Sequence, residues 1–313
     1  DVGKGIIVAD KHPAYVTRRL AEEWSARNGA RIMIVQHHIA HIMSVLAEHG
    51  IDPSKKIVGI AIDGIGYGDD GQIWGGEVFF GRPEKLRRVG HLIYSPMPGG
   101  DKATRFPIRM LIGILSMFLG DDEIRQIINK RGLIRGLRNE KELDVILKQA
   151  RYPRTIKTSS MGRTLDSVSA FLGICLERTY EGEPAIKLEA FAREGKILDD
   201  IDIKIEYVDG QWIINTKKMF ESILEIDADA KSIARTVQYK LGYAMGEIAK
   251  KYLSLADIQT IFVSGGAAVN DYIIKGIHEG SGADILLNRK VPAGDGGISL
   301  GQIYYAIISG GAE

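Results

Sequence analysis

The chain has 313 residues, of which 45% are hydrophobic and 26% charged, as in an ordinary globular protein with roughly two domains. Its 41 Lys and Arg residues nearly balance its 40 Asp and Glu residues, so overall charge gives no reason to expect nucleic acid as a partner. The single cysteine excludes an internal disulfide, and the longest apolar run, residues 110–119, is too short to span a membrane. With no secretory signal at its start, the chain is predicted to be cytoplasmic, without membrane contacts.

The first elements alternate between strand and helix. Short apolar runs predict strands at residues 6–9 and 31–35, and amphipathic stretches predict helices at residues 14–27 and 40–49. Because strands that alternate with helices usually pair in parallel, this part predicts a parallel sheet.

The pattern changes after residue 56. Three consecutive strands, at residues 57–62, 73–80 and 86–93, predict an antiparallel meander. A loop rich in glycine and aspartate, residues 63–71, joins the first two strands. Its backbone can turn sharply and approach a ligand closely.

The rest of the chain is predicted to be mainly helical with a few strands. Residues 101–150 are mostly helix, and a hairpin turns at Asp209-Gly210. Further helices are expected at residues 164–176, 185–193, 217–224, 230–253, 272–279 and 297–308, and strands at 201–208, 211–215, 260–263 and 285–287. Cys175 lies in an apolar helical run, which indicates a buried packing residue rather than a nucleophile.

Three of the seven histidines, His37, His38 and His41, lie at a predicted junction between strand and helix. His37 and His41 are four residues apart, so on a helix their imidazoles would face the same way, as two ligands of one metal ion must. Neutral imidazole suits zinc, iron, nickel or copper. The alternative is a histidine cluster that binds nothing.

Asp295 is the carboxylate that we expect to join His37 and His41. Two imidazoles and one carboxylate leave coordination positions open, which catalysis at a metal requires. The alternative role for Asp295 is to cap the last predicted helix, with the adjacent glycines serving the turn.

Glycine-rich segments follow three predicted strands, after Ile62, Val263 and Val291. In an open α/β sheet, loops at the carboxyl ends of strands converge on the binding crevice. The segment 264–266, with Asn270 at the next helix start, would bring backbone amides and a helix N-terminus to a nucleotide. The alternative is that these glycines only form tight turns.

One more acidic residue, Asp166, belongs to a predicted helix that precedes residues 180–184. An acidic residue beside a nucleotide crevice can bind the ribose hydroxyls. By itself, however, Asp166 is equally well explained as a solvated helix residue.

Seven ordered motifs span nearly the whole chain. They are VQHHIAH at residues 35–41, DGIGYG at 63–68 with WGGE at 74–77, GDKATR at 100–105, TSSMGR at 158–163, YEGEP at 180–184, SGG at 264–266 with Asn270, and DGG at 295–297 with Gly301-Gln302. In this combination the chain resembles the C-terminal domain of the HypF family, the hydrogenase maturation carbamoyltransferases. That domain is similar to the tRNA threonylcarbamoyltransferases and the antibiotic O-carbamoyltransferases. The resemblance implies the α/β actin/Hsp70/sugar-kinase (ASKHA) fold, with two lobes and mixed sheets flanked by helices.

The resemblance also implies roles for individual residues. His37, His41 and Asp295 match ligands of a divalent metal, iron or zinc. The implied catalytic residues are His38, Asp63, Lys102 and Arg105, with His38 beside the carbamoyl group or phosphate. The implied nucleotide-binding residues are Asp63, Gly64, Gly66 and Tyr67 at the phosphate and acyl group, Asp166, Gly182 and Glu183 at the ribose, and Gly265, Gly266 and Asn270 at the adenine.

The activity implied by the resemblance is carbamoyl transfer. Carbamoyl phosphate and ATP give carbamoyl-adenylate in a YrdC-like domain or subunit. The carbamoyl group then passes to the C-terminal cysteine thiol of a HypE-type partner, a step toward the cyanide ligands of nickel–iron hydrogenase. The alternatives are threonylcarbamoyl transfer to tRNA, O-carbamoyl transfer to a small molecule, and a nucleotide-binding subunit without catalytic activity.

The chain also departs from the family pattern. Where the family usually has Arg-Glu-Pro-Trp-Arg, residues 105–109 read RFPIR, so a role for the acidic position is lost. The resemblance implies that the chain begins inside the pattern, as a fragment or one half of a split enzyme. It predicts residues 1–55 as the remainder of the first lobe, with a helix in residues 295–313 packing back on it. Residues 56–294 are predicted to form the second lobe, with the glycine loops and helical insertions.

Overall fold

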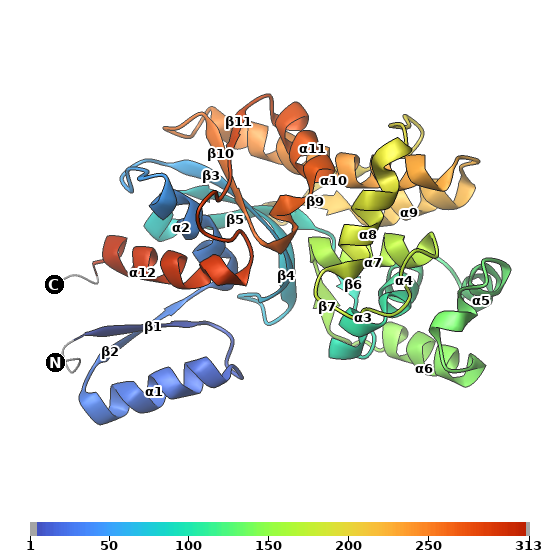
Figure 1. The fold of residues 1–313 in the computed structure, drawn as a ribbon, viewed down its shortest axis with the longest axis horizontal. Helices are drawn as coiled ribbons and strands as arrows, with labels where there is room; N and C mark the ends of the chain where they lie inside the picture. The colour runs from blue at the N-terminus through green and yellow to red at the C-terminus, as the bar shows by residue number, and fades with distance from the viewer. Residues whose placement is uncertain (1–4, 311–313) are drawn as a thin grey trace.

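The computed structural model describes residues 5–310, and Figure 1 shows their arrangement. The chain begins with a small parallel sheet of β1 (Ile6–Asp10) and β2 (Arg31–Val35), connected by α1 (Val16–Asn28). The predicted parallel pairing is therefore confirmed. Gly29 ends α1 in the left-handed region, with φ 67°, as a glycine after a helix commonly does.

Helix α2 (His37–Glu48) begins three residues earlier than predicted. Its N-terminal cap is Gln36, whose side-chain oxygen accepts a hydrogen bond from the backbone N–H of Ile39 at 3.0 Å. This cap satisfies an amide that would otherwise have no partner at the helix start. As a result His37 and His41 both lie on the helix, where the four-residue spacing places them on one face.

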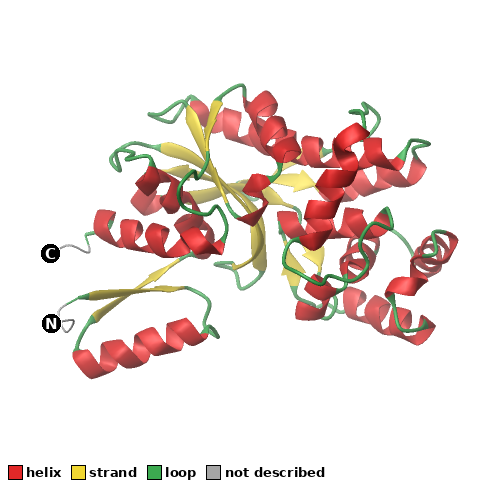
Figure 2. Ribbon diagram, viewed as in Figure 1, coloured by secondary structure: helices red, strands yellow, loops and turns green. Residues whose placement is uncertain are grey.

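The central sheet has nine strands and a mixed topology, and helices cover it on both sides (Figure 2). Its main order is β11–β10–β3–β4–β5–β9–β8, with β6 and β7 paired beside β4. The strands are β3 (Ile57–Tyr67), β4 (Ile73–Gly81), β5 (Arg87–Leu92), β6 (Ser95–Pro96), β7 (Lys157–Thr158), β8 (Lys204–Val208), β9 (Gln211–Asn215), β10 (Thr260–Ser264) and β11 (Asp284–Leu286). The predicted meander β3–β4–β5 is antiparallel, and β11, β10 and β3 are parallel.

Strand β3 extends five residues beyond its predicted end. Its pairing with β4 is interrupted between Ile62 and Gly66 and then resumes at Gly66 and Tyr67. The expectation of a loop over residues 63–71 is therefore wrong in its first half. Because the register shifts there, the residues from Asp63 to Ile65 are released from the ladder, and Asp63 can face the site described below.

The helices follow the predicted order. They are α3 (Asp101–Arg105), α4 (Pro107–Leu115), α5 (Asp121–Lys130), α6 (Glu140–Arg151), α7 (Met161–Phe171), α8 (Glu183–Phe191), α9 (Thr216–Glu225), α10 (Ala230–Leu253), α11 (Asp271–Ser281) and α12 (Ile298–Ile308), with short 3-10 turns between them. Helix α7 ends five residues before its predicted end, since Gly173 turns the chain with φ 69°. Cys175 is accordingly not helical, but it is buried as predicted.

The two faces of the central sheet are covered by different helices. Alternate side chains of β3 point to opposite faces: Ile57 packs with α2 and α12, whereas Val58 and Ile60 pack with α4, α7 and α10. Helices α2 and α12 approach so closely that a Cβ on Gly301 would lie 1.8 Å from the backbone oxygen of Ala40. This contact fixes α12, and with it the segment around Asp295, against the helix that carries the histidines.

Helix α12 thus packs on α2, while the small sheet and α1 lie apart from the helices on the right in Figure 1. The division into lobes at residues 55 and 294 remains a prediction, and its outer ends, residues 1–4 and 311–313, lie outside the described residues. Among the described helices, none combines the length and apolar character needed to cross a membrane.

Candidate metal and nucleotide site

Four potential metal ligands converge where α2, β3 and the start of α12 meet. His37, His41, Asp63 and Asp295 each offer one nitrogen or oxygen, and these atoms lie within 4.8 Å of one another. The structure therefore brings together the three ligands that we predicted and adds Asp63, for which the family resemblance implied a role at the phosphate and in catalysis. A signal was present in the sequence, because Asp63 directly follows the buried run of β3 at its carboxyl end.

The distances within this cluster suit one small cation. His37 Nε2 lies 3.4 Å from Asp63 Oδ2 and 3.7 Å from Asp295 Oδ1. His41 Nε2 lies 3.8 Å from Asp63 Oδ2 and 3.7 Å from Asp295 Oδ1. Ligands about 2.1 Å from a tetrahedral ion are about 3.4 Å apart, so small movements would complete a coordination shell.

The Nε2 atoms of the two imidazoles have no hydrogen-bond partner in the described chain, which leaves them available to a metal ion. Both His37 and His41 are buried. Such orphaned buried nitrogens are costly unless a ligand satisfies them. His37 Nδ1 is held 2.8 Å from Asp10 Oδ2, an interaction typical of the carboxylates that orient metal-bound histidines. Sequence reasoning missed Asp10, which lies 27 residues away at the end of β1.

The charges of the cluster favour a divalent cation. Burial opposes the charged form of His37, but the hydrogen bond with Asp10 and the nearby negative charge of Asp63 outweigh it and raise the His37 pKa to about 10. Burial also disfavours ionised Asp63, but the nearby imidazoles of His37 and His41 hold its pKa well below the usual range. Burial and the neighbouring His37 charge lower the His41 pKa to about 4. Three carboxylates, those of Asp10, Asp63 and Asp295, surround the two imidazoles, and a divalent ion would offset this surplus of acidic groups.

His38 does not line the cavity beside this cluster, so its predicted contact with the carbamoyl group is not supported by the geometry. The ring is completely buried, and its Nδ1 lies 3.1 Å from the side-chain nitrogen of Gln36. Because the Gln36 nitrogen must donate, the proton of neutral His38 is assigned to Nε2. A Cβ on Gly66 would lie 2.4 Å from His38 Cε1 and 2.7 Å from His37 Cδ2. Gly66 is therefore required for packing against the histidines and does not line the cavity.

A cavity of about 620 Å³ opens beside Asp63 and Asp295, within the range of about 300–1,000 Å³ usual for ligand sites. The predicted site residues that line it are Asp63, Gly64, Asp166, Gly182, Gly266, Asn270 and Asp295. Residues from both ends of the chain and from its middle thus share one cavity.

Hydrogen bonds hold the loops of this cavity in place. The backbone N–H of Gly266 donates to Asp63 Oδ1 at 3.1 Å, and Ser160 Oγ donates to the backbone oxygen of Gly64 at 2.6 Å. Gly265 has φ 110°, and a Cβ there would lie 2.2 Å from the Ile62 oxygen, so this glycine serves the backbone rather than the cavity. Asn270 caps α11 and donates to Gln238, so its side chain is already engaged.

Two arginines that we did not predict also line the cavity. Arg163 pairs with Asp166 at 2.7 Å, and both side chains are buried. Burial raises the Asp166 pKa, although Arg163 and Arg178 oppose the rise. The Arg178 guanidinium has no ion-pair partner in the described chain, which leaves it available to an anionic ligand. Arg163 could have been found, since it closes the motif at residues 158–163, whereas nothing local distinguishes Arg178.

Other predicted residues lie outside the cavity lining. Tyr67 contributes its backbone oxygen to Gln36, and the Glu183 carboxylate accepts from Thr179 and Lys187. The hydrogen bonds from Lys187 and Thr179 lower the Glu183 pKa to about 2.

The predicted catalytic residues of α3 are likewise placed elsewhere. Lys102 is exposed, and Arg105 forms an exposed ion pair with Glu177 at 2.9 Å. The reason is the geometry of α3, a five-residue helix on which Thr104 is the residue that lines the cavity. Phe106, which replaces the acidic residue of the family pattern, packs against the core.

Comparisons with known proteins show which family the chain resembles. A family profile described as "Carbamoyltransferase, Kae1-like Domain, second subdomain" matches residues 59–302, and one described as "HypF Kae1-like domain" matches residues 1–48. The "Probable carbamoyltransferase HypF" of Methanocaldococcus jannaschii is 39% identical over 97% of this chain, which spans 39% of that relative's length. The "Carbamoyltransferase HypF homolog" of Cupriavidus necator is 30% identical over 96% of the chain, which spans 77% of that relative.

Two solved structures share the fold. The crystal structure of T. kodakarensis HypF has a TM-score of 0.87 at 36% identity and covers 98% of this chain, which spans 41% of that protein. A structure of full-length HypF in the phosphate- and nucleotide-bound form has a TM-score of 0.80 at 31% identity, covering 96% of this chain and 46% of that one. The predicted ASKHA-type fold is therefore confirmed, and the chain belongs to the HypF carbamoyltransferase family, in which it corresponds to the Kae1-like domain.

Proposed function

We propose that this domain transfers a carbamoyl group from carbamoyl-adenylate to the C-terminal cysteine thiol of a HypE-type protein. The observation that carries the proposal is the cluster of His37, His41, Asp63 and Asp295, which meets a cavity with glycine loops and two arginines. A cation site beside a cavity of this size would suit transfer from an adenylate. One relative whose fold this chain shares is described as bound to phosphate and nucleotide, which supports the same use of the cavity here.

The donor set suits iron or zinc, both of which accept imidazole and carboxylate ligands. When bound, such an ion would supply a positive charge beside the carbamoyl and phosphate oxygens. The residues themselves supply the remaining functions. Gly64 and Gly266 present backbone at the cavity, and Arg178 offers an unpaired positive charge to the phosphate or to the chain-terminal carboxylate of the acceptor.

In the proposed step, the thiolate sulfur of the acceptor attacks the carbamoyl carbon. A carbon–sulfur bond forms, the bond from that carbon to the phosphate oxygen breaks, and AMP leaves with the electron pair. The thiol proton passes to solvent before attack. No nucleophile of this chain takes part, which agrees with Cys175, whose burial raises its pKa and disfavours the thiolate.

The proposed reaction needs two partner proteins and takes place in the cytoplasm. A YrdC-like domain or subunit makes the carbamoyl-adenylate from carbamoyl phosphate and ATP, and a HypE-type protein accepts the carbamoyl group in the cytoplasm. Family membership favours a protein thiol over tRNA or a small molecule as the acceptor, and the near-balance of 41 basic against 40 acidic residues agrees.

The direct test combines the purified chain, loaded with iron or zinc, with carbamoyl phosphate, ATP, a YrdC-like enzyme and a HypE-type acceptor. Mass spectrometry of the acceptor should show one added carbamoyl group on its terminal cysteine. An acceptor without that cysteine is the control and should gain nothing.

Two different outcomes would replace the proposal. Adenylate binding without transfer to the acceptor would support a nucleotide-binding subunit without catalytic activity. Transfer to tRNA or to a small hydroxyl acceptor, but never to the thiol, would support a threonylcarbamoyltransferase-like or an O-carbamoyltransferase activity.

A further inference from the structure

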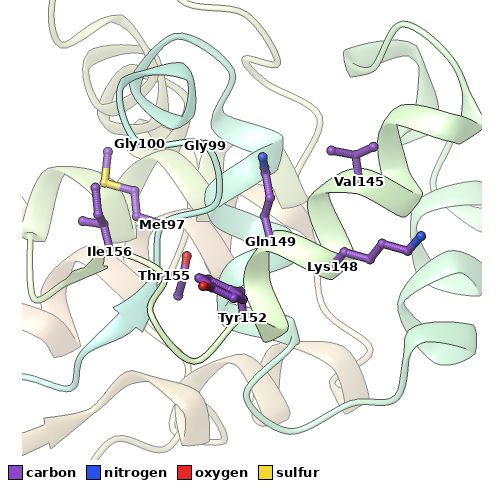
Figure 3. Close-up of a pocket in the computed structure, with 9 residues that line it drawn as sticks. All are labelled: Met97, Gly99, Gly100, Val145, Lys148, Gln149, Tyr152, Thr155 and Ile156. Atoms are coloured by element: carbon purple, nitrogen blue, oxygen red, sulfur yellow. The ribbon is translucent and has the colours of Figure 1, made fainter.

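A second hollow lies between α6 and the start of α3, away from the metal cluster. It measures about 400 Å³, and Figure 3 shows the side chains around it. Its apolar members include Met97, Val145, Tyr152 and Ile156, and we call it the α6 groove. Val145, Tyr152 and Ile156 are 51%, 56% and 48% exposed. Large apolar side chains gathered in one exposed hollow are typical of an interaction site.

The sequence of α6 shows that this exposure is systematic. Three lining residues on α6, Val145, Lys148 and Gln149, have the spacing i, i+3, i+4 and share one face of the helix, and Tyr152, which caps its C-terminal end, also lines the groove. The opposite face is already buried in the core through Leu143, Ile146, Leu147 and Ala150. A helix face left to solvent is normally polar, so Val145 and Tyr152 give α6 a second apolar face without a partner in the described chain.

The rim of the α6 groove is positively charged. Lys148 is the cation that lines it, and Lys102, Arg154 and Lys157 are close to lining residues in the sequence, within two positions. All four are exposed, and none forms an ion pair within residues 5–310. Asp101 is an exposed acid in the same stretch, so the local balance stays positive. An apolar hollow with unpaired cations complements an apolar side chain flanked by acidic residues.

The α6 groove is adjacent to the central cavity. Met97 lines the groove and packs in a small cluster with Ala103 and Met110, against which Ile65 also packs. Ile65 in turn lines the central cavity. A single cluster of side chains thus separates the two hollows, so a protein bound at the groove would lie beside the cavity.

We infer that the α6 groove docks an apolar side chain, flanked by acidic residues, of the protein that carries the acceptor thiol. The inference rests on the proposed function, because it assigns the thiol to a protein. Docking beside the cavity raises the effective concentration of the thiol there without a contact to the reacting atoms. The groove therefore selects the acceptor protein, and the transfer takes place in the cavity.

The test compares two tyrosines of nearly equal exposure. Tyr152→Ala removes the centre of the groove, and Tyr207→Ala, at a tyrosine 59% exposed on β8, is the matched control. Lys148→Glu is matched by Lys204→Glu on the same β8 strand. Binding of a HypE-type acceptor protein is measured by calorimetry, and transfer is measured both to that protein and to free cysteine.

The expected result is a Kd and a KM for the acceptor protein raised about tenfold or more by Tyr152→Ala and by Lys148→Glu. The value of kcat and the rate with free cysteine should stay unchanged, as should every value in the two controls. Equal acceptor affinity in the Tyr152→Ala and Tyr207→Ala variants would overturn the inference. So would an equal loss with free cysteine, or self-association of the chain that only Tyr152→Ala abolishes.

The same measurements separate this inference from the proposed function. Acceptor binding that depends on Tyr152 in a wild-type chain that transfers no carbamoyl group would reject the function and keep the docking site. Efficient transfer that is indifferent to Tyr152 would keep the function and reject the docking site.

Discussion

The two sides of the central cavity are built in different ways. On the metal side, His37, His41 and Asp63 are buried and held by neighbouring groups, and glycines let the backbone approach the imidazoles. On the helical side, Asp166 is held in a buried ion pair, whereas Arg178 is half-buried and has no ion-pair partner in the described chain. The residues of the metal side are therefore held in place before a ligand arrives, whereas the Arg178 side chain can move at little cost. A side chain that is fixed in advance is suited to chemistry, and a mobile one to accommodating different molecules.

The largest effect should follow from loss of a metal ligand. His41→Ala removes a nitrogen that no other described group can replace, so metal content should fall and the transfer rate should drop about 1,000-fold, the equivalent of about 4 kcal/mol. Metal analysis and the transfer assay check this together. Asp69→Asn, at an exposed residue paired with Lys11, is the control. A metal-free variant with full activity would refute the ligand assignment.

A smaller effect should follow from Asp10→Asn. The Asp10 carboxylate lies 2.8 Å from His37 Nδ1 and orients the ring without reaching the proposed ion. Loss of such a carboxylate typically weakens metal binding about 10- to 100-fold. Titration with zinc in competition with a chelator measures the change. An unchanged affinity would show that the ring is held by packing alone.

The third prediction tests the close packing around the histidines. Gly66→Ala would place a Cβ against His38 and His37 and should destabilise the protein by about 1–3 kcal/mol. Gly64→Ala is the matched control, since a Cβ there meets nothing within 4 Å. Urea unfolding of the two variants gives the difference. Equal free energies of unfolding for the two variants would show that the histidines can move aside for an added methyl group, so that the metal side is not rigid.

The smallest effect is expected on the helical side. Arg105→Ala breaks an exposed ion pair with Glu177, and such pairs contribute about 0–1 kcal/mol. The free energy of unfolding should therefore change by less than about 1 kcal/mol. The transfer rate should change less than about fivefold. A loss of 100-fold or more in kcat would show that the guanidinium turns into the cavity during the reaction, as the family resemblance led us to expect.

Local patterns predicted most of the fold. The hairpin at Asp209-Gly210 and the helix over residues 230–253 follow from turn chemistry and helical periodicity, which act over a few neighbouring residues. The errors occurred where distant groups override local signals. The strand β3 runs past Ile62 because β4 pairs with it beyond an irregularity, and no local pattern shows that partner.

For the candidate site, the sequence by itself determined that His37 and His41 share one helix face, since four residues make roughly one turn. Only the tertiary structure decided that Asp10 and Asp63 join them, because these carboxylates lie on β1 and β3 and their positions depend on how those strands pair and pack beside the helix. It also decided that Lys102 and Arg105 lie outside the cavity lining, because the direction of a side chain depends on how its short helix packs and not on its motif.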